Sequence, residues 1–220
     1  VGSVGAIKKR FVLNGEEYIG GRHVDPVVDV SMRGKGVFTK MLKVLNEVNN
    51  DVDFIYTFPN KASFRGFEKM GYTPAGPLPV GYCHMGFQSG GMKDKIKYFK
   101  TGFKLCLNNH TNVVKGSIED LKEAVWKMPA DRYALVRDYR YISWRYGKSP
   151  IKNYDVLICR NEKEEILNAC VVTHKDDLVC LVDLLEYSKP IAIENYLVAV
   201  RQMYGPVTAW LWKNNVERKI

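Results

Sequence analysis

Residues 23–72 read HVDPVVDVSMRGKGVFTKMLKVLNEVNNDVDFIYTFPNKASFRGFEKMGY. The run at 23–28 predicts a strand, and the basic glycine turn RGKG follows it at 33–36. Over 37–48, apolar residues recur at spacings of three and four, which predicts an amphipathic helix. A strand that passes through a glycine turn into a helix start is a place to hold phosphate, because the first helical N–H groups lack partners.

A second strand and a second helix complete this stretch. Residues 54–58 form a short, mostly apolar strand pattern that suits a central position in a sheet. Asn60 can cap a helix that begins beside it, and Gly71 has the position of a glycine that ends a helix. Three apolar side chains of this helix are expected to be buried: Phe64, Phe67 and Met70.

A β-hairpin precedes this stretch. Residues 1–13 are rich in strand-forming residues, and Asn14-Gly15 is a strong signal for a two-residue hairpin turn. The returning strands span 17–30, with a break expected at Gly20-Gly21. Asp25-Pro26 within this run predicts a bulge or an edge position, because proline has no N–H to donate.

The second half of the chain repeats this order of elements. The predicted elements are strands over 154–160, 166–174 and 178–185, a helix over 191–203 and a strand over 207–212. Each half has an Asp in the strand before its helix, Asp25 in the first and Asp183 in the second. The second half has YSKP at 187–190 in place of the glycine turn. We therefore expect two lobes of one repeated fold, of which only the first has the phosphate turn.

Three segments lie between these regions. A strand is predicted over 82–87, and a helix over 117–127 with Ser117 as N-cap and Asp120 reaching back to it. Residues 132–146 are dense in Arg and Tyr. This third segment is either a surface that binds an acceptor, through Arg forks and aromatic rings, or an amphipathic helix that packs the core between the lobes.

The composition restricts the possible partners. The 220 residues carry a net charge of +9, and 46% are hydrophobic, which suffices for a packed core. The excess of basic residues suits the binding of a phosphorylated cofactor. The sequence contains no Lys/Arg stripe with interleaved aromatic residues, so we do not expect nucleic-acid binding. The sequence contains no apolar run of about 18 residues, so we expect no membrane-spanning helix. The five cysteines include no CxxC pair, so we expect no metal site and a reduced, cytoplasmic setting.

The turn at 33–36 has the residue types that bind a diphosphate. Gly34 and Gly36 permit unusual dihedral angles and close approach, and Arg33 and Lys35 add positive charge. The spacing is neither that of a P-loop nor the dinucleotide pattern GxGxxG, because position 39 is Thr. Taken alone, the turn is equally compatible with a tight connection from strand to helix.

Together with the hairpin before it, this stretch resembles the acetyl-CoA-binding core of the GNAT superfamily of N-acetyltransferases, over residues 1–87. The resemblance implies an α/β (α+β) fold with a mixed, mostly antiparallel sheet flanked by helices. It also implies that the turn grips the pyrophosphate of CoA and that the strand before the turn pairs with the pantetheine arm. The cofactor-binding residues that carry over are Val28, Arg33, Gly34, Lys35, Gly36, Val37, Phe38, Asn60 and Ser63.

The whole chain resembles larger bacterial GNAT proteins with two such lobes. This implies an acetyl-CoA-binding core at 1–88, without the first strand and helices of the family, and a linker at 89–116. A degenerate second lobe, incomplete at its C-terminal end, would occupy 117–220.

The implied activity is transfer of an acetyl group from acetyl-CoA to a primary amine of a small molecule, for example an amino sugar. Two residues depart from the family: Ser31 at the first position of its Q/RxxGxG pattern, and Phe67 where many members have a Tyr that acts as general acid. Phe67 motivates one alternative, a catalytically inactive GNAT-like binding protein. A second alternative is a Fem-type aminoacyl ligase, against which the intact glycine turn argues.

Direct acyl transfer needs a base for the attacking amine. His23 and Asp25 fall on the same face of a regular strand, so either is a candidate catalytic residue. Each also has a purely structural interpretation, as an exposed strand residue for His23 and as a bulge residue for Asp25.

Overall fold

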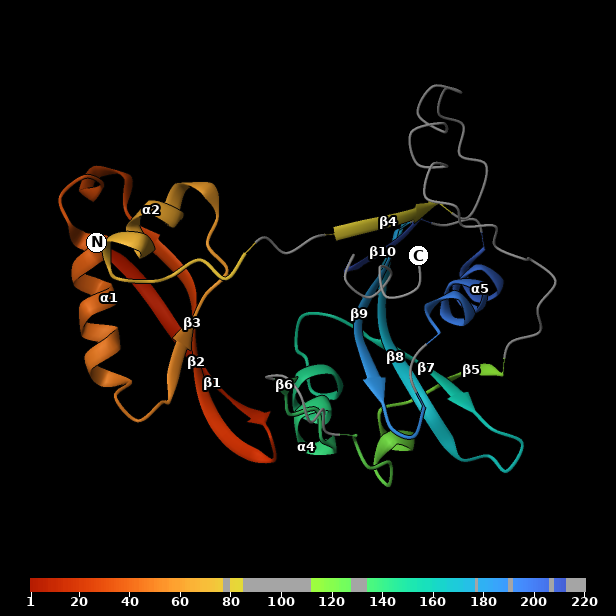
Figure 1. Ribbon diagram of the computed structural model, residues 1–220. Coiled ribbons are helices and arrows are strands. Elements are labelled where there is room, and N and C mark those ends of the chain that lie inside the picture. Colours follow the sequence, from red (N-terminus) through yellow and green to blue (C-terminus); the bar gives the residue numbers. More distant parts are fainter. Residues whose placement is uncertain are drawn as a thin grey trace. The chain divides into compact units, whose positions relative to one another are not determined.

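The structure is a computed structural model of the chain, and it describes residues 1–76, 80–84, 112–127, 134–176, 178–189, 192–205 and 208–212 (Figure 1). The chain forms two compact units. In the described part, the first unit comprises 1–76 and 134–136, and the second unit comprises the other residues.

The first unit contains a four-stranded sheet of order β3-β2-β1-β6. Its strands are β1 (Gly2–Leu13), β2 (Glu16–Val28), β3 (Phe54–Tyr56) and β6 (Ala134–Leu135). β3 is parallel to β2, and the other neighbours are antiparallel. The predicted turn at Asn14-Gly15 is confirmed, because both residues have positive φ, 52° and 83°. The central position predicted for 54–58 is wrong, because β3 lies at an end of this sheet.

The break predicted at Gly20-Gly21 is also wrong, because β2 runs through both residues. The reason for glycine at position 20 is close packing. A Cβ on Gly20 would lie 2.7 Å from the Phe11 ring and 2.8 Å from the Phe54 ring. These two rings contact each other edge to face, with centroids 5.0 Å apart, directly over the strand.

The bulge predicted at Asp25-Pro26 is confirmed. The register between β1 and β2 shifts here, so that Ser3 faces Val27 and Gly5 faces Val24. Asp25 has a φ of 49°, in the left-handed region, which a residue inside a bulge can adopt.

Two helices complete the first unit. α1 (Val37–Val48) lies along the β1–β2 hairpin and buries Leu42 completely (Figure 1). Its apolar face ends before Val48, which is 71% exposed. α2 (Lys61–Lys69) buries Phe67, whereas Phe64 is exposed, so the burial predicted for Phe64 is wrong. α2 contacts Phe38 of α1 through Gly66 and Phe67, which follow Phe64 along the helix.

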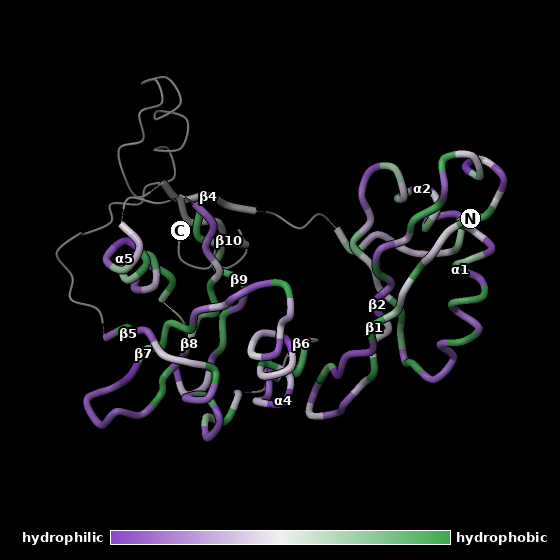
Figure 2. Tube along the Cα trace, turned by 180° about the vertical axis from the view of Figure 1, so that it is seen from behind, coloured by the Kyte–Doolittle hydropathy of each residue, from purple (hydrophilic) through white to green (hydrophobic). Residues whose placement is uncertain are grey.

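The second unit is built on a six-stranded sheet of order β4-β10-β9-β8-β7-β5. Its elements are β4 (Val80–His84), β5 (Val113–Gly116), β7 (Asp155–Arg160), β8 (Ile166–Lys175), β9 (Leu178–Glu186), α5 (Ile193–Tyr204) and β10 (Thr208–Trp212). These bounds confirm the strands and helix predicted between 154 and 212. The hydrophobic colouring of β8 and β9 in Figure 2 marks the strands at the centre of the core.

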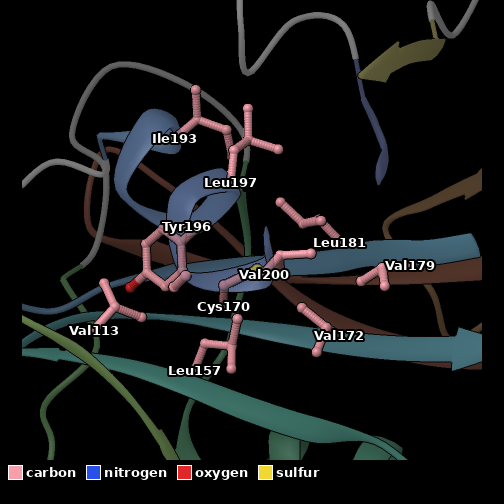
Figure 3. Close-up of a cluster of buried hydrophobic side chains, with 11 residues drawn as sticks. Val113, Leu157, Cys170, Val172, Val179, Leu181, Ile193, Tyr196, Leu197 and Val200 are labelled. Carbon is pink, nitrogen blue, oxygen red and sulfur yellow. The ribbon is translucent and has the colours of Figure 1, made fainter. Parts of the chain in front are cut away.

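The core of the second unit lies between α5 and this sheet. Tyr196 and Val200 of α5 lie on the side of the helix that faces Leu157 and Val172 on the strands, and Leu197 belongs to the same buried cluster (Figure 3). All five are essentially inaccessible to solvent. Burial of one such aliphatic side chain contributes about 1.5–3 kcal/mol, so this helix is a principal source of stability for the unit.

The helix predicted over 117–127, and the helix that is one of two alternatives for 132–146, are largely absent in the described residues. The capping pair predicted at Ser117 and Asp120 is confirmed, because the Asp120 N–H donates to Ser117 Oγ at 3.4 Å and the Ser117 N–H donates to the Asp120 carboxylate at 2.7 Å, but only a 3-10 turn (Glu119–Leu121) follows. The chain then leaves the helical path, since the Lys127 N–H donates to the Glu186 carbonyl at 3.0 Å. Segment 132–146 contains β6, the short helix α4 (Tyr139–Ile142) and a π turn (Ser143–Gly147) in place of one helix.

The repetition predicted for the two halves is visible in the topology. In the first unit the hairpin β1–β2 leads into α1 and then into β3, parallel to β2. In the second unit the hairpin β8–β9 leads into α5 and then into β10, parallel to β9. Most of the predicted linker, 89–116, lies outside the described residues, so the domain boundaries stay predictions.

Candidate functional site

The turn that joins β2 to α1 begins with a 3-10 turn (Val30–Met32) capped by Asp29. The Asp29 carboxylate accepts hydrogen bonds from the Ser31 N–H at 2.8 Å and the Ser31 hydroxyl at 2.6 Å. These bonds lower the pKa of Asp29, which therefore stays ionised. Both the N–H and the hydroxyl of Ser31 are therefore used in hydrogen bonds within the turn.

The two glycines of the turn have the conformations that the sequence predicts. Gly34 and Gly36 have φ of 76° and 74°, and a Cβ on either would meet no other atom within 4 Å. Neither glycine is therefore required by crowding among the described residues, and the backbone dihedral angles are the reason for glycine at both positions.

The N-terminus of α1 has free donors. Gly36 is its N-cap and supplies no side chain to bind the first N–H groups. The first helical backbone bond runs from the Lys40 N–H to the Gly36 carbonyl at 3.1 Å, so the N–H groups of Val37, Phe38 and Thr39 have no partner within the helix. With the positive end of the helix dipole and the exposed side chains of Arg33 and Lys35, this turn favours an anion.

Packing against α2 fixes the turn. The Phe38 ring meets the Phe67 ring edge to face, with centroids 5.3 Å apart. A Cβ on Gly66 would lie 2.5 Å from the Phe38 ring, so α2 approaches the first turn of α1 as closely as a glycine allows. Arg33 folds back on the strand, where its Nε donates to the Val28 carbonyl at 3.3 Å.

β2 has an open edge beside this turn. Its pairing with β3 ends at Arg22, and the Thr57 hydroxyl donates to the next carbonyl, that of His23, at 3.3 Å. β2 nevertheless continues to Val28, paired with β1 on its other side. In the part of the chain that the structure describes, no strand covers this edge from Val24 to Val28, and its backbone groups can bind an extended ligand.

Asn60 and Ser63 lie together at the start of α2. The Asn60 side chain caps the helix and accepts hydrogen bonds from the N–H groups of Ala62 and Ser63, each at 3.0 Å. The Ser63 hydroxyl lies 3.2 Å from the same Asn60 oxygen. The capping prediction is confirmed, and the cofactor role of both residues stays a prediction.

The two candidate bases have different environments. His23 is 2% exposed, whereas Asp25 is exposed at the bulge. The alternation that placed them on one face does not hold, because Asp25 has left-handed backbone geometry. Burial lowers the pKa of His23, so its imidazole is neutral near pH 7.

His23 has two neighbours that the sequence analysis missed. The Tyr72 hydroxyl lies 3.0 Å from His23 Nδ1 and donates to Asn46 Oδ1 at 3.4 Å. Tyr72 directly follows Gly71, whose φ of 85° ends α2, and the Tyr72 N–H returns to the Phe67 carbonyl at 3.2 Å. The glycine that ends the helix was therefore the available signal, because such an ending turns the next residue back over the helix.

The corresponding positions of the second unit are closed. The N–H groups of Tyr187, Ser188 and Lys189 all point to one acceptor, the Leu167 carbonyl, at 3.0–3.2 Å. They are not available to a phosphate. Asp183 is buried, where it accepts hydrogen bonds from Arg137 Nε at 2.7 Å and the Tyr146 hydroxyl at 2.8 Å.

The described residues contain no group of three or more His, Cys, Asp or Glu side chains arranged to hold a metal ion. None of the described helices has the length and apolar character needed to span a bilayer.

No family model matches the chain, and no curated protein matches it in sequence. Solved structures do resemble it. Saccharomyces cerevisiae N-myristoyltransferase with bound myristoyl-CoA aligns with a TM-score of 0.58 at 7% identity, over 96% of this chain and 60% of that one. A GCN5-related N-acetyltransferase from Kribbella flavida aligns with a TM-score of 0.53 at 14% identity, over 96% of this chain and 50% of that one.

An Enterococcus faecalis protein described as a probable N-acyltransferase gives a TM-score of 0.53 at 11% identity, over 96% of this chain and 51% of that one. The chain thus spans between half and three-fifths of the length of these proteins. At such low identity the similarity establishes the fold, and it confirms the predicted mixed α+β architecture of GNAT-like proteins.

Proposed function

We propose that the protein is an N-acyltransferase that moves an acyl group from acyl-CoA to an amine. The observation that carries this proposal is the turn at 33–38, where two positive-φ glycines and an uncapped helix start lie next to the open edge of β2. A diphosphate at the turn and an extended amide-containing arm along the strand edge are both features of CoA.

Each part of this region has a role in the proposed activity. The N–H groups at the start of α1 and the side chains of Arg33 and Lys35 bind the diphosphate. The backbone of β2 from Val24 to Val28 pairs with the amides of the pantetheine arm and positions the thioester. The thioester supplies the activated acyl group, and Asp25 and His23 are the candidate bases for the attacking amine.

We propose acetyl-CoA as the donor, which the residues of the turn favour by their resemblance to acetyltransferases. The likeness to an enzyme with bound myristoyl-CoA makes longer acyl chains the natural second set of donors to test. For the acceptor we propose a primary amine of a small molecule, such as an amino sugar. The closed turn at 187–189 supports our proposal that the second unit is a degenerate copy, as in the tandem bacterial type.

The direct test is release of CoA thiol by the purified chain. Acetyl-CoA and myristoyl-CoA would each be supplied with a panel of amino sugars, polyamines and peptides, and free thiol would be measured with a thiol reagent. We expect release that depends on both donor and amine. If the chain binds neither donor in calorimetry, the proposal is wrong.

One observation favours a second candidate, a protein that binds acyl-CoA without transferring the acyl group. Phe67 is 2% exposed and packs between Phe38 and Tyr72, so this position provides no hydroxyl for the leaving thiolate. Tight donor binding with no amine-dependent thiol release across the panel would support this candidate.

A further inference from the structure

We propose that Thr57 is a specificity-determining residue that restricts the donor to short acyl chains, because its side chain closes the point where β2 and β3 separate. This inference rests on the proposed function and names the class of donor that the same site accepts. Acetyl-CoA is used, and donors with longer acyl chains are excluded by the volume of one side chain.

The two parallel strands separate at a single point. Residues Gly20–Arg22 of β2 pair with Phe54–Tyr56 of β3, and the pairing ends there. In the same register the next pair would join His23 to Thr57. In its place the Thr57 hydroxyl donates to the His23 carbonyl at 3.3 Å, and Thr57 is partly buried. The Thr57 side chain therefore occupies the position that the next backbone pair would fill.

The proposed ligand extends towards this point. A diphosphate at the turn 33–36 lies past the Val28 end of β2, and the arm bound along the free strand edge runs from Val28 to Val24. These residues span about 13 Å at roughly 3.3 Å per residue. The thioester at the far end of the arm then lies beside the His23 carbonyl, so an acyl chain that continues in the same direction meets Thr57.

One face of the sheet is filled beside this point. His23 is 2% exposed, and its ring lies against the Tyr72 ring with centroids 6.0 Å apart. The Tyr72 hydroxyl also donates to Asn46 of α1 at 3.4 Å. A long acyl chain would have to displace these side chains to turn towards this face.

The other face carries Arg22 and Phe58, because successive residues of a strand point to opposite sides. The Arg22 guanidinium lies over the Phe58 ring, 4.9 Å from its centroid, and the Phe58 ring meets the Tyr56 ring edge to face. A chain turned to this face would have to displace the guanidinium from the ring. Phe58 is 53% exposed, so such a chain would also stay partly in water and gain little from burial.

Behind Thr57 the sheet is continuous. The ladder between β2 and β3 runs on to Gly20, where a Cβ would lie 2.7 Å from the Phe11 ring and 2.8 Å from the Phe54 ring. The space freed by shortening Thr57 is therefore limited to the volume of its own methyl and hydroxyl groups. Shortening this side chain should admit one or two more carbon atoms, but not a myristoyl chain.

The test measures kcat/KM of the full-length chain with acetyl-CoA, propionyl-CoA, butyryl-CoA and myristoyl-CoA. Each turnover forms one bond from the amine nitrogen to the acyl carbon, breaks the carbon–sulfur bond and passes one amine proton to the thiolate, so one CoA thiol is released. The affinity for each donor is measured by calorimetry in parallel. The chain-length preference is then obtained even if the protein binds donors without transferring the acyl group.

Three variants separate the volume of Thr57 from its hydrogen bond. Thr57→Ala removes both the methyl and the hydroxyl group, and Thr57→Val keeps the volume but loses the hydroxyl. Thr173→Ala is the matched control, because the Thr173 hydroxyl also donates to a backbone carbonyl, that of Asn153, at 3.1 Å in the second unit.

We expect the wild type and Thr173→Ala to prefer acetyl-CoA over butyryl-CoA by at least about tenfold, the effect of a methylene that a closed site does not accommodate. Thr57→Val should keep this preference. Thr57→Ala should reduce it to about threefold or less, because the site then has room for the added carbons. Myristoyl-CoA should remain a poor donor for every variant.

Equal preference of the wild type for acetyl-CoA and butyryl-CoA would overturn the inference, as would an unchanged preference in Thr57→Ala or a lost preference in Thr57→Val. If Thr57→Ala does not fold, Thr57→Ser, which removes only the methyl group, takes its place and should also weaken the preference. If the chain does not bind CoA, the proposed function fails and this inference with it. If CoA binds but chain length has no effect, only the assignment of Thr57 is wrong.

Discussion

Asp25 and Asp183 occupy equivalent places in the two units, each at a bulge in the strand that leads into a helix, but only Asp183 is buried. β2 shifts its register against β1 around Asp25, and β9 shifts its register against β8 next to Asp183. Asp25 is exposed, whereas Asp183 is 8% exposed and bonded to Arg137 and Tyr146.

This difference distinguishes an open copy from a closed one. Around Asp25 the strand edge and the following turn keep their backbone donors available. The Asp183 carboxylate accepts hydrogen bonds from Arg137 and Tyr146. The N–H groups of the turn after β9 donate to the Leu167 carbonyl. The same topology therefore has an open strand edge and turn in the first unit, where we propose the ligand site, and a hydrogen-bonded core in the second.

The buried network at Asp183 should contribute measurably to stability. Tyr146→Phe removes the hydroxyl that donates to the Asp183 carboxylate at 2.8 Å and should lower the free energy of unfolding by about 1.5–3 kcal/mol, as expected for a bond to a charged group. Tyr154→Phe is the control, because Tyr154 packs against Tyr146 and its hydroxyl makes no hydrogen bond with the part of the chain that the structure describes. Urea unfolding of both variants gives the comparison; equal losses would show that the bond contributes nothing.

Stability should depend on pH through His23. Burial lowers the pKa of His23 in the folded state below the ordinary value of about 6.5, so the unfolded chain binds the proton more readily. The free energy of unfolding should therefore fall as the pH drops below about 6.5 and should level off below the folded pKa. Guanidinium unfolding between pH 7.5 and pH 5 tests this, and an unchanged slope in His23→Gln would contradict it.

The positive charge of the turn should act on CoA binding in a salt-dependent way. Lys35→Gln removes an exposed charge from the turn and should weaken CoA binding by roughly twofold to fivefold at low salt, with a smaller effect at high salt. Lys43→Gln removes an exposed charge from the middle of α1 and should leave the affinity nearly unchanged. Equal losses for both variants would mean that only the net charge of the protein matters.

The local sequence patterns predicted most of the elements. The Asn14-Gly15 turn, the helix at 37–48 and the bulge at Asp25-Pro26 each depend on a few adjacent residues, and all are confirmed. The glycine turn was equally local, and its two positive-φ residues are where the sequence placed them.

The errors came from contacts between distant residues. Gly20 looked like a strand break, but it makes room for two aromatic rings that the fold brings over the strand. Segment 117–127 has the two hydrogen bonds of a capping box between Ser117 and Asp120. The helix nevertheless ends after one 3-10 turn, and the Lys127 N–H donates to the Glu186 carbonyl. Tyr72 and Asn46 are 49 and 23 residues from His23, so no sequence spacing could place them beside it.

The measurement that tests the account most directly is calorimetric titration of CoA into the full-length chain, with Gly36→Ala and Gly15→Ala as matched variants. Both glycines have positive φ, 74° and 83°, with open space around a Cβ, so both changes impose similar backbone strain of about 1–2 kcal/mol. Gly36 lies in the turn, whereas Gly15 lies in the β1–β2 hairpin. We predict that the wild type and Gly15→Ala bind CoA and that Gly36→Ala loses at least tenfold in affinity, about 1.4 kcal/mol. Equal affinity in the two variants, or no binding by the wild type, would contradict the assignment of the turn.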